Sequence, residues 1–249
     1  MDREEDIPDW WDDDELTDPD TKQEEDETAK ECSEIECEKL PETQLLKLQI
    51  LYNNPLLTKM GSEEEVSKLI NSVMTHVQAY YCHPSLGSKV KLQQSGVKYY
   101  KESWPVKPET LERLRKILDT DLKDSKADLF VGLTYNNDTY GDMGMAWTKV
   151  VCDKWERNSC TSINKWDSDM TTFANTVAHE VGHNLGMMHD ENKNHKAKGC
   201  DKQGIMSDGD NWNKWSTCSR DDFTNHYRTV MNRGESWCLP PAPSACAGL

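Results

Sequence analysis

The sequence predicts an α/β fold in which helices pack on a single β-sheet. Apolar residues alternate with polar ones in short segments and recur at helical spacing in longer ones, and the two kinds of segment follow each other along the chain. Alternation is typical of half-buried strands, and recurrence every three or four residues is typical of amphipathic helices. Strands that alternate with helices favour a sheet layered with helices.

Four segments are expected to form strands. Two of them alternate apolar and polar residues, as a strand with one solvent-facing side does. A third is a nearly continuous apolar run of the kind found in central strands. The four segments are residues 46–50, 89–92, 127–134 and 143–151.

Four further segments are expected to form helices. Ser62 and Glu65 have the spacing of a capping box, Pro108 suits a first turn, and Gly234 suits the end of the last helix. The helices are expected from Ser62, from Pro108, over residues 170–185 and over residues 219–233. The expected buried stripes of the first two are Val66, Leu69, Ile70, Val73, Val77 and Tyr80, and Leu111, Leu114, Leu118 and Leu122.

The net charge of -16 is concentrated at the N-terminus. Residues 1–44 contain 20 acidic and 4 basic side chains, whereas the remaining 205 residues contain 25 of each. We therefore expect an acidic tail or propeptide remnant over residues 1–44, a folded domain over 45–240 and a short tail over 241–249. The balanced charge of the domain excludes a basic, nucleic-acid-binding class. No apolar run approaches the roughly 20 residues that span a bilayer, and a monomer is expected.

Nine cysteines favour a disulfide framework and a secreted protein. No C-x-x-C pair marks a zinc ribbon or a redox site. Met1 is followed by acidic residues rather than by a basic and then apolar leader, so a secretion signal is expected to lie outside this sequence.

Residues 179–190, with the sequence HEVGHNLGMMHD, carry the candidate site. His179 and His183 lie four apart on a predicted helix, so both imidazoles project from one face. A catalytic zinc takes three protein ligands and keeps one open position. His189 can supply the third ligand if the chain reverses after the helix, and Gly186 lies where that reversal needs a left-handed residue.

Glu180, beside the first histidine, is the candidate general base. Zinc lowers the pKa of bound water to about 7. We expect Glu180 to accept a proton as water attacks a scissile carbonyl, and to pass it to the departing amine. A structural zinc site is closed by four ligands and would have no use for this carboxylate. The site therefore predicts hydrolysis of peptide bonds.

The run from His179 to His189 resembles the H-E-x-x-H-x-x-G-x-x-H pattern of the metzincins, which are zinc endopeptidases. Asp190, directly after the third histidine, resembles the reprolysin branch, which includes the ADAM proteases and the snake-venom metalloproteases. Met206 lies 17 residues after His189, in a segment that resembles the methionine turn beneath the zinc. The resemblance covers roughly residues 45–240.

The resemblance implies a metzincin fold and a single catalytic zinc. Its twisted, mostly parallel mixed sheet has one antiparallel edge strand and is flanked by helices, and the active-site helix lies under the cleft. An extended polypeptide substrate would bind along the edge strand by β-augmentation. The residues that resemble this strand are Gly144, Met145, Ala146 and Trp147.

The resemblance also implies two disulfides, Cys152–Cys238 and Cys200–Cys218. Gly204 stands where many relatives have a cysteine before the methionine turn, so that further bridge is not expected. The cysteines without an implied partner are Cys32, Cys37, Cys82, Cys160 and Cys246.

Neither calcium nor further histidine ligands are expected. Pro240 and Pro241 stand where relatives have an asparagine that helps to bind calcium. The remaining histidines are expected at the surface or at helix caps, and they are His76, His83, His195 and His226.

The main functional hypothesis is an active endopeptidase that cuts extracellular proteins. The alternative is a metzincin fold kept for binding alone, although such a protein has no chemical need for Glu180 and the three histidines. A third hypothesis is a latent enzyme in which residues 1–44 occlude the cleft. Cys32 or Cys37 could then ligate the zinc, but their surroundings do not resemble the family's cysteine switch, so a local disulfide is favoured.

Overall fold

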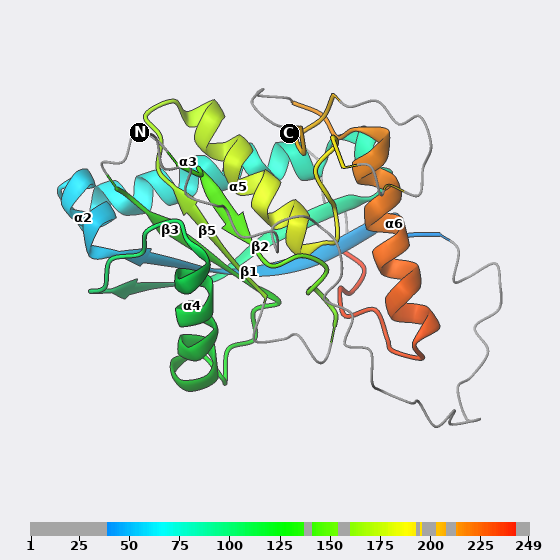
Figure 1. Ribbon diagram of the computed structural model, residues 1–249, viewed down its shortest axis with the longest axis horizontal. Helices are drawn as coiled ribbons and strands as arrows, with labels where there is room; N and C mark the ends of the chain where they lie inside the picture. Colours follow the sequence, from blue (N-terminus) through cyan, green and yellow to red (C-terminus); the bar gives the residue numbers. More distant parts are fainter. Residues whose placement is uncertain are drawn as a thin grey trace, which may run out of the picture. The chain divides into compact units, whose positions relative to one another are not determined.

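A five-stranded sheet with helices on both faces organises the chain (Figure 1). The computed structural model describes residues 39–136, 141–153, 160–192, 195, 203–207 and 213–242. In chain order the elements are β1 Thr43–Asn53, α2 Asn54–Met60, α3 Glu63–Tyr81, the short 3-10 helix η2 Pro84–Leu86, β2 Lys89–Tyr100, α4 Pro108–Asp121, β3 Leu129–Thr134, β4 Gly144–Ala146, β5 Thr161–Lys165, α5 Met170–Asn184 and α6 Thr217–Asn232. The predicted α/β class is confirmed.

The sheet is mostly parallel. Its strand order is β2-β1-β3-β5-β4, and β2, β1, β3 and β5 pair in parallel. The last strand, β4, pairs antiparallel with β5, so that Met145 lies opposite Ile163. One antiparallel strand at the edge of a parallel sheet is the arrangement that the resemblance implies.

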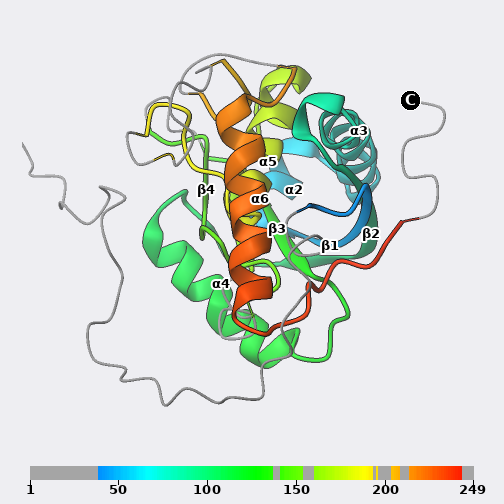
Figure 2. The same cartoon turned by 90° about the vertical axis from the view of Figure 1, so that its right-hand side faces the viewer.

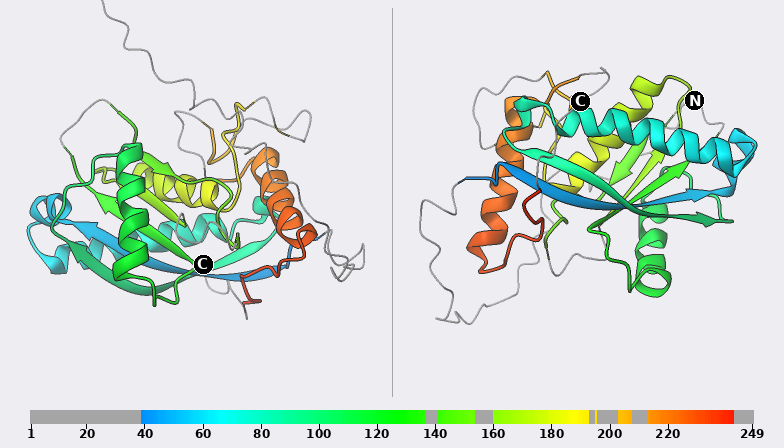
Figure 3. Two further views of the ribbon diagram at one scale, coloured as in Figure 1. Left: turned by 60° about the horizontal axis from the view of Figure 1, so that its bottom comes forward. Right: turned by 180° about the vertical axis from the view of Figure 1, so that it is seen from behind.

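Helices α3 and α5 pack on one face of the sheet and α4 packs on the other (Figure 3). The predicted apolar stripe of α3 is buried against the sheet, and the predicted leucines of α4 are buried with Phe130 and Ile163. Helix α6 stands at one end of these layers and faces the viewer in Figure 2. Two apolar cores, one on each side of the sheet, therefore hold the layers together.

The helix starts follow from the capping residues. The Ser62 side chain accepts a hydrogen bond from the Glu65 backbone N–H at the start of α3, as the capping box predicts. Helix α2 was not predicted. Asn53 ends β1 and at once caps α2 by accepting from the Leu56 N–H, while Pro55 lies in the first turn. The two elements meet without a loop, which hides the boundary in the sequence.

The predicted strand over residues 143–151 is wrong beyond Ala146. The strand ends there because the chain turns, and both Lys149 (φ 59°) and Cys152 (φ 66°) adopt left-handed conformations. Strand β5 was not predicted, since four of its five residues are polar although all five are buried. It lies between β3 and β4, where Asn164 donates to the Gly132 carbonyl.

The folded region extends slightly past the predicted boundaries of 45 and 240. Leu40 is buried, and β1 begins at Thr43. At the other end Pro241 forms a β-bridge with Gln44, and Ala242 is buried. The predicted tails over residues 1–38 and 243–249 lie outside the described residues.

Candidate active site

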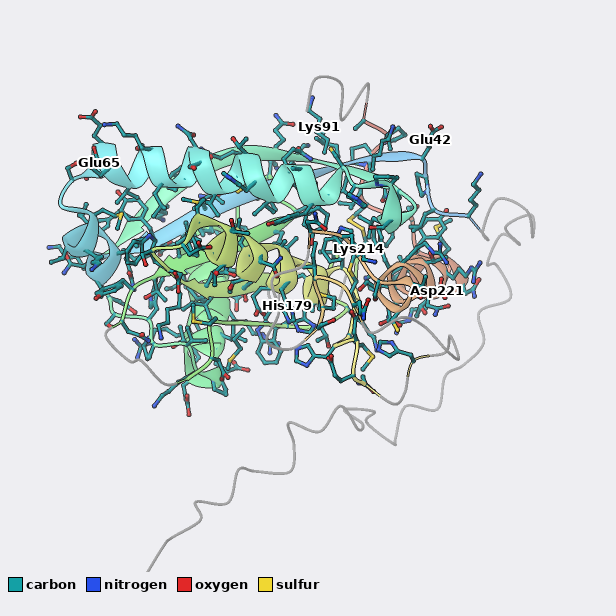
Figure 4. The ribbon with its side chains drawn as sticks, turned by 90° about the horizontal axis from the view of Figure 1, so that it is seen from above. Glu42, Glu65, Lys91, His179, Lys214 and Asp221 are labelled. Carbon is teal, nitrogen blue, oxygen red and sulfur yellow. A yellow bond between two sulfur atoms is a disulfide. The ribbon has the colours of Figure 1, made fainter. Side chains whose placement is uncertain are left out.

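Helix α5 carries the first two histidines. Its N-terminus is capped by Asp169, whose side chain accepts from the Thr172 N–H. The helix is anchored by its buried residues Phe173, Val177 and Val181. His179 and His183 follow one turn apart, and their ring centroids lie 4.8 Å apart. Figure 4 labels His179 on α5, which runs beside α3 on the same face of the sheet.

The chain reverses directly after α5, as the motif predicts. Gly186 has φ 97°, and its N–H donates to the His183 carbonyl, while the Met187 N–H donates to the Gly182 carbonyl. A Cβ atom at Gly186 would also lie 2.5 Å from Cβ of His226. Glycine is therefore required here both by the backbone angle and by the close approach of α6.

The reversal brings His189 back to the two helical histidines. Its Nε2 atom lies 3.1 Å from Nε2 of His179 and 3.1 Å from Nε2 of His183. Among the described residues these three histidines are the group that could hold a metal ion. Zinc–nitrogen bonds of about 2.0–2.1 Å at tetrahedral angles place ligand nitrogens about 3.3 Å apart. The cluster therefore fits a zinc ion.

Hydrogen bonds fix the orientation of the two helical imidazoles. Nδ1 of His179 lies 2.8 Å from the Ile205 carbonyl oxygen, and Nδ1 of His183 lies 2.9 Å from the Met187 carbonyl oxygen. A carbonyl only accepts, so each Nδ1 carries the hydrogen and each Nε2 keeps its lone pair for a metal. Burial lowers the pKa of His183 well below its usual range, which also favours the neutral, ligating form.

The segment around Met206 lies against the same helix. Met206 is fully buried, and a Cβ atom at Gly182 would lie 2.8 Å from its sulfur. The Met206 carbonyl accepts from the Asp190 N–H. The carboxylate of Asp190 accepts hydrogen bonds from three serine hydroxyls, which belong to Ser207, Ser216 and Ser219. Burial raises the pKa of Asp190, and the serine hydrogen bonds oppose this shift. Asp190 thus joins the histidine loop to the Met206 segment and to the start of α6.

Glu180 is buried and lies against the edge strand. A Cβ atom at Gly144 of β4 would lie 2.4 Å from Oε1 of Glu180 and 2.6 Å from its Cγ atom. Burial, and then the charge of Asp142, raises the pKa of Glu180 well above its usual range. A bound cation would oppose this shift. The Glu180 carboxyl therefore occupies space that a side chain at position 144 would fill.

The edge strand and α5 are joined by Asn184. Its side-chain N–H groups donate to the carbonyls of Trp147 (2.8 Å) and Thr161 (3.0 Å). Of the four residues that resemble the substrate strand, Gly144, Met145 and Ala146 form β4, and Trp147 follows directly. The clamp by Asn184 was not predicted, although Asn184 stands within the motif, because a side-chain bond across 37 residues leaves no local pattern.

Two of the histidines expected at the surface are buried. His226 of α6 packs on Gly186 and contacts the Val151 carbonyl oxygen at 2.7 Å through Nε2. The side chain of His195 is 4% exposed and touches both His189 and Asp222. Their interpretation as surface or cap residues is wrong, because the tertiary structure supplies polar partners that the sequence does not reveal. His83 does cap a helix, namely η2.

Four of the described cysteines are in disulfides. Cys152 is bonded to Cys238, the first pair that the resemblance implies. Cys82 and Cys218 are also in disulfides, and the structure does not describe the partner of either one. Cys200, the partner expected for Cys218, lies outside the described residues, as do Cys32, Cys37 and Cys246. Cys160 is buried, and its thiol donates to the Val150 carbonyl.

Comparisons with known proteins agree with this geometry. Residues 44–243 match the reprolysin (M12B) family zinc metalloproteases. Snake venom metalloproteinase trimerelysin-2 of Protobothrops flavoviridis is 25% identical over 203 residues, which are 80% of this chain and 96% of that protein. Disintegrin and metalloproteinase domain-containing protein 9 of Homo sapiens is 37% identical over 107 residues, which are 41% of this chain and 12% of that protein.

A likeness to a solved structure concerns the fold alone. The chain aligns with one in a "Structure of a chaperone-substrate complex" at a TM-score of 0.57 and 17% identity, covering 78% of this chain and 35% of that one. Within the described part of the chain, no helix is both long enough and apolar enough to cross a membrane. The family match spans most of the sequence and includes the three histidines. The chain therefore belongs to the reprolysin (M12B) family of zinc metalloproteases, and it is a metalloendopeptidase.

Proposed function

We propose that the chain cleaves internal peptide bonds of extracellular proteins with one zinc ion held by His179, His183 and His189. The observation that carries this proposal is the convergence of the three Nε2 atoms, with the ring orientation of two histidines set by backbone carbonyls. Three ligands on one side leave a position open for water or substrate, as a catalytic site requires. Calcium is not part of the proposal.

Glu180 is proposed as the general base. It follows the first ligand on α5, and its buried carboxyl is confined beside β4. Zinc, when bound, supplies Lewis acidity that lowers the pKa of water and polarises a carbonyl. Glu180 accepts the proton released as water attacks the scissile carbonyl and then donates it to the leaving amine.

Substrate is proposed to bind along β4 as an additional strand. In the described sheet β4 pairs with β5 on one side and ends the strand order on the other. An edge strand offers backbone N–H and C=O groups to an extended peptide. Because Gly144 of this strand touches Glu180, a peptide paired here would have its backbone close to the proposed base.

Secretion is proposed from the disulfides. The Cys152–Cys238 bond and the bonded state of Cys82 and Cys218 suit an oxidising compartment. One relative is a venom protein by its name, which supports extracellular protein substrates. A monomer is also proposed. Nucleic-acid partners are not, since residues 45–249 carry no excess of positive charge.

The test is the Glu180→Ala variant, with zinc content and casein cleavage both measured. We expect the wild type to hold one zinc and to lose cleavage with a chelator, and the variant to retain zinc but lose cleavage by several orders of magnitude. Glu64→Ala, at an exposed position of α3, is the matched control and should cleave normally. Cleavage by Glu180→Ala at the wild-type rate would exclude Glu180 as the base.

The same assay addresses the binding-protein and latent-enzyme hypotheses. Zinc binding without cleavage, both by the wild type and after removal of the N-terminal tail, would favour the catalytically silent protein. Activity that appears only after removal of residues 1–31 would favour the latent enzyme. That deletion retains Cys32 and Cys37 and leaves Leu40 and β1 in place.

A further inference from the structure

The backbone around His189 is held by residues outside the H-E-x-x-H motif. The start of the loop is bonded to α5 through the N–H groups of Gly186 and Met187, and its end is bonded to the Met206 carbonyl through the Asp190 N–H. Between these points the His189 carbonyl oxygen lies 2.7 Å from Nε2 of His195. A carbonyl oxygen only accepts, so this nitrogen donates to it.

Asp222 of α6 contacts both His195 and the loop. Its Oδ2 atom lies 3.0 Å from Nδ1 of His195 and accepts from the Met188 N–H at 3.1 Å. The side chains of His195 and Asp222 are 4% and 9% exposed. In so buried a place, the hydrogen bond that the Met188 N–H donates to this carboxylate is stronger than it would be in water.

We propose that His195 and Asp222 form a positioning pair that fixes the backbone of residues 188 and 189 and so aims the imidazole of His189 at the metal. Asp222 accepts from the Met188 N–H, and His195 donates to the His189 carbonyl, so the peptide groups before Met188 and after His189 are both held. The inference rests on the proposed ligation by His189. Partners of this kind change metal affinity by about 10–100-fold when they are removed.

The pair stabilises a part of the site that the helix cannot control. His179 and His183 are placed by the helical backbone, whereas His189 follows a left-handed residue at the end of a loop. A small shift of the loop backbone would move Nε2 of His189 away from the Nε2 atoms of His179 and His183. Asp222 ties the Met188 N–H of the loop to α6, and His195 adds a hydrogen bond to the carbonyl of His189, the ligand residue itself.

The test measures zinc affinity at fixed pH by competition with a chromophoric chelator. His195→Ala and Asp222→Ala are each expected to lower affinity about 10–100-fold. The double variant is expected to lose less than the two single losses combined, because His195 and Asp222 contact each other. His76→Ala and Asp221→Ala remove the same side-chain types at other positions of α3 and α6, and they should keep the wild-type affinity.

Cobalt spectra and a conservative variant separate positioning from simple loss of packing. We expect the Co²⁺-loaded His195→Ala protein to show shifted d–d bands, since the third ligand moves. His195→Gln keeps an N–H that can reach the His189 carbonyl, so it should recover most of the zinc affinity. This expectation can be tested even if His195→Ala does not fold. An affinity for His195→Gln as low as that of a folded His195→Ala would overturn the proposal.

His189→Ala distinguishes this inference from the proposed ligand set. If His189→Ala binds zinc as the wild type does, the ligand assignment fails. If it loses zinc while His195→Ala and Asp222→Ala keep both affinity and cobalt spectrum, only the positioning pair is refuted.

Discussion

At Gly144 the absence of a side chain gives the Glu180 carboxyl its place. A Cβ atom there would lie 2.4 Å from Oε1, 2.6 Å from Cγ and 2.7 Å from Cδ of Glu180. The overlap involves the stem of the side chain and not only its tip, so a small rotation cannot relieve it. Glu180 is 6% exposed, which leaves it little room to move aside.

Gly144→Ala is therefore expected to reduce peptide cleavage about 100-fold, since a displacement of about 1 Å costs that much in a catalytic group. Zinc content should not change, because the three atoms nearest to the added Cβ all belong to Glu180, which is not a proposed ligand. Cleavage rate and bound zinc are measured on the same sample.

Gly96→Ala is the matched control for that substitution. Gly96 also lies in a strand, and its nearest neighbour would be 3.8 Å from the added Cβ. It should cleave at the wild-type rate. Equal activity of Gly144→Ala and Gly96→Ala would mean that Glu180 is not confined by β4.

At the scale of elements, the C-terminal end of α5 is completed by the turn that follows β4. The N–H groups of Lys149, Val150 and Val151 donate to the carbonyls of His183 and Asn184. A helix leaves its last four carbonyls without partners in the helix. The turn supplies donors to two of these residues, and the Asn184 side chain donates in return to the end of the edge strand.

Asn184→Ala is expected to lower the free energy of unfolding by about 1–3 kcal/mol, because it leaves the Trp147 carbonyl and the carbonyl of the buried Thr161 without this donor. Urea unfolding monitored by tryptophan fluorescence measures the change. Asn71→Ala, at an exposed position of α3, should stay within about 0.5 kcal/mol of the wild type. Similar stabilities for both variants would argue against the clamp.

The sequence predicts elements whose partners are local and misses those whose partners are distant. The capping box at Ser62, the stripe of α3 and the glycine reversal at Gly186 each follow from spacing within a few residues. Strand β5 is polar and buried because strands on both sides satisfy it, so its pattern does not predict a strand. The burial of the His195 side chain likewise depends on Asp222 of α6, and that of His226, on α6 itself, depends on the distant Val151.

At the scale of the whole molecule, the C-terminal segment closes the fold by returning to its first strand. The Leu45 N–H donates to the Pro240 carbonyl, and Thr43 donates through its hydroxyl to the Ala242 carbonyl. Between this segment and α6, Trp237 donates to the Gln44 side chain. The segment therefore links the start of β1 to the end of α6.

The Cys152–Cys238 disulfide joins this C-terminal segment to the turn that completes α5, across 86 residues of sequence. The Cys152→Ser/Cys238→Ser variant should lose up to about 4–5 kcal/mol of stability in the chain-entropy model, since a long loop is no longer closed in the unfolded chain. The transition midpoint in urea should fall clearly, and limited proteolysis should cut first near residue 238.

Cys160→Ser replaces a buried thiol without breaking this bond, so it controls for the change from sulfur to oxygen. If the double variant unfolds at the same urea concentration as Cys160→Ser, the hydrogen bonds to β1 alone hold the C-terminal segment. If it unfolds earlier but still cleaves casein, the bond supports the fold without shaping the site.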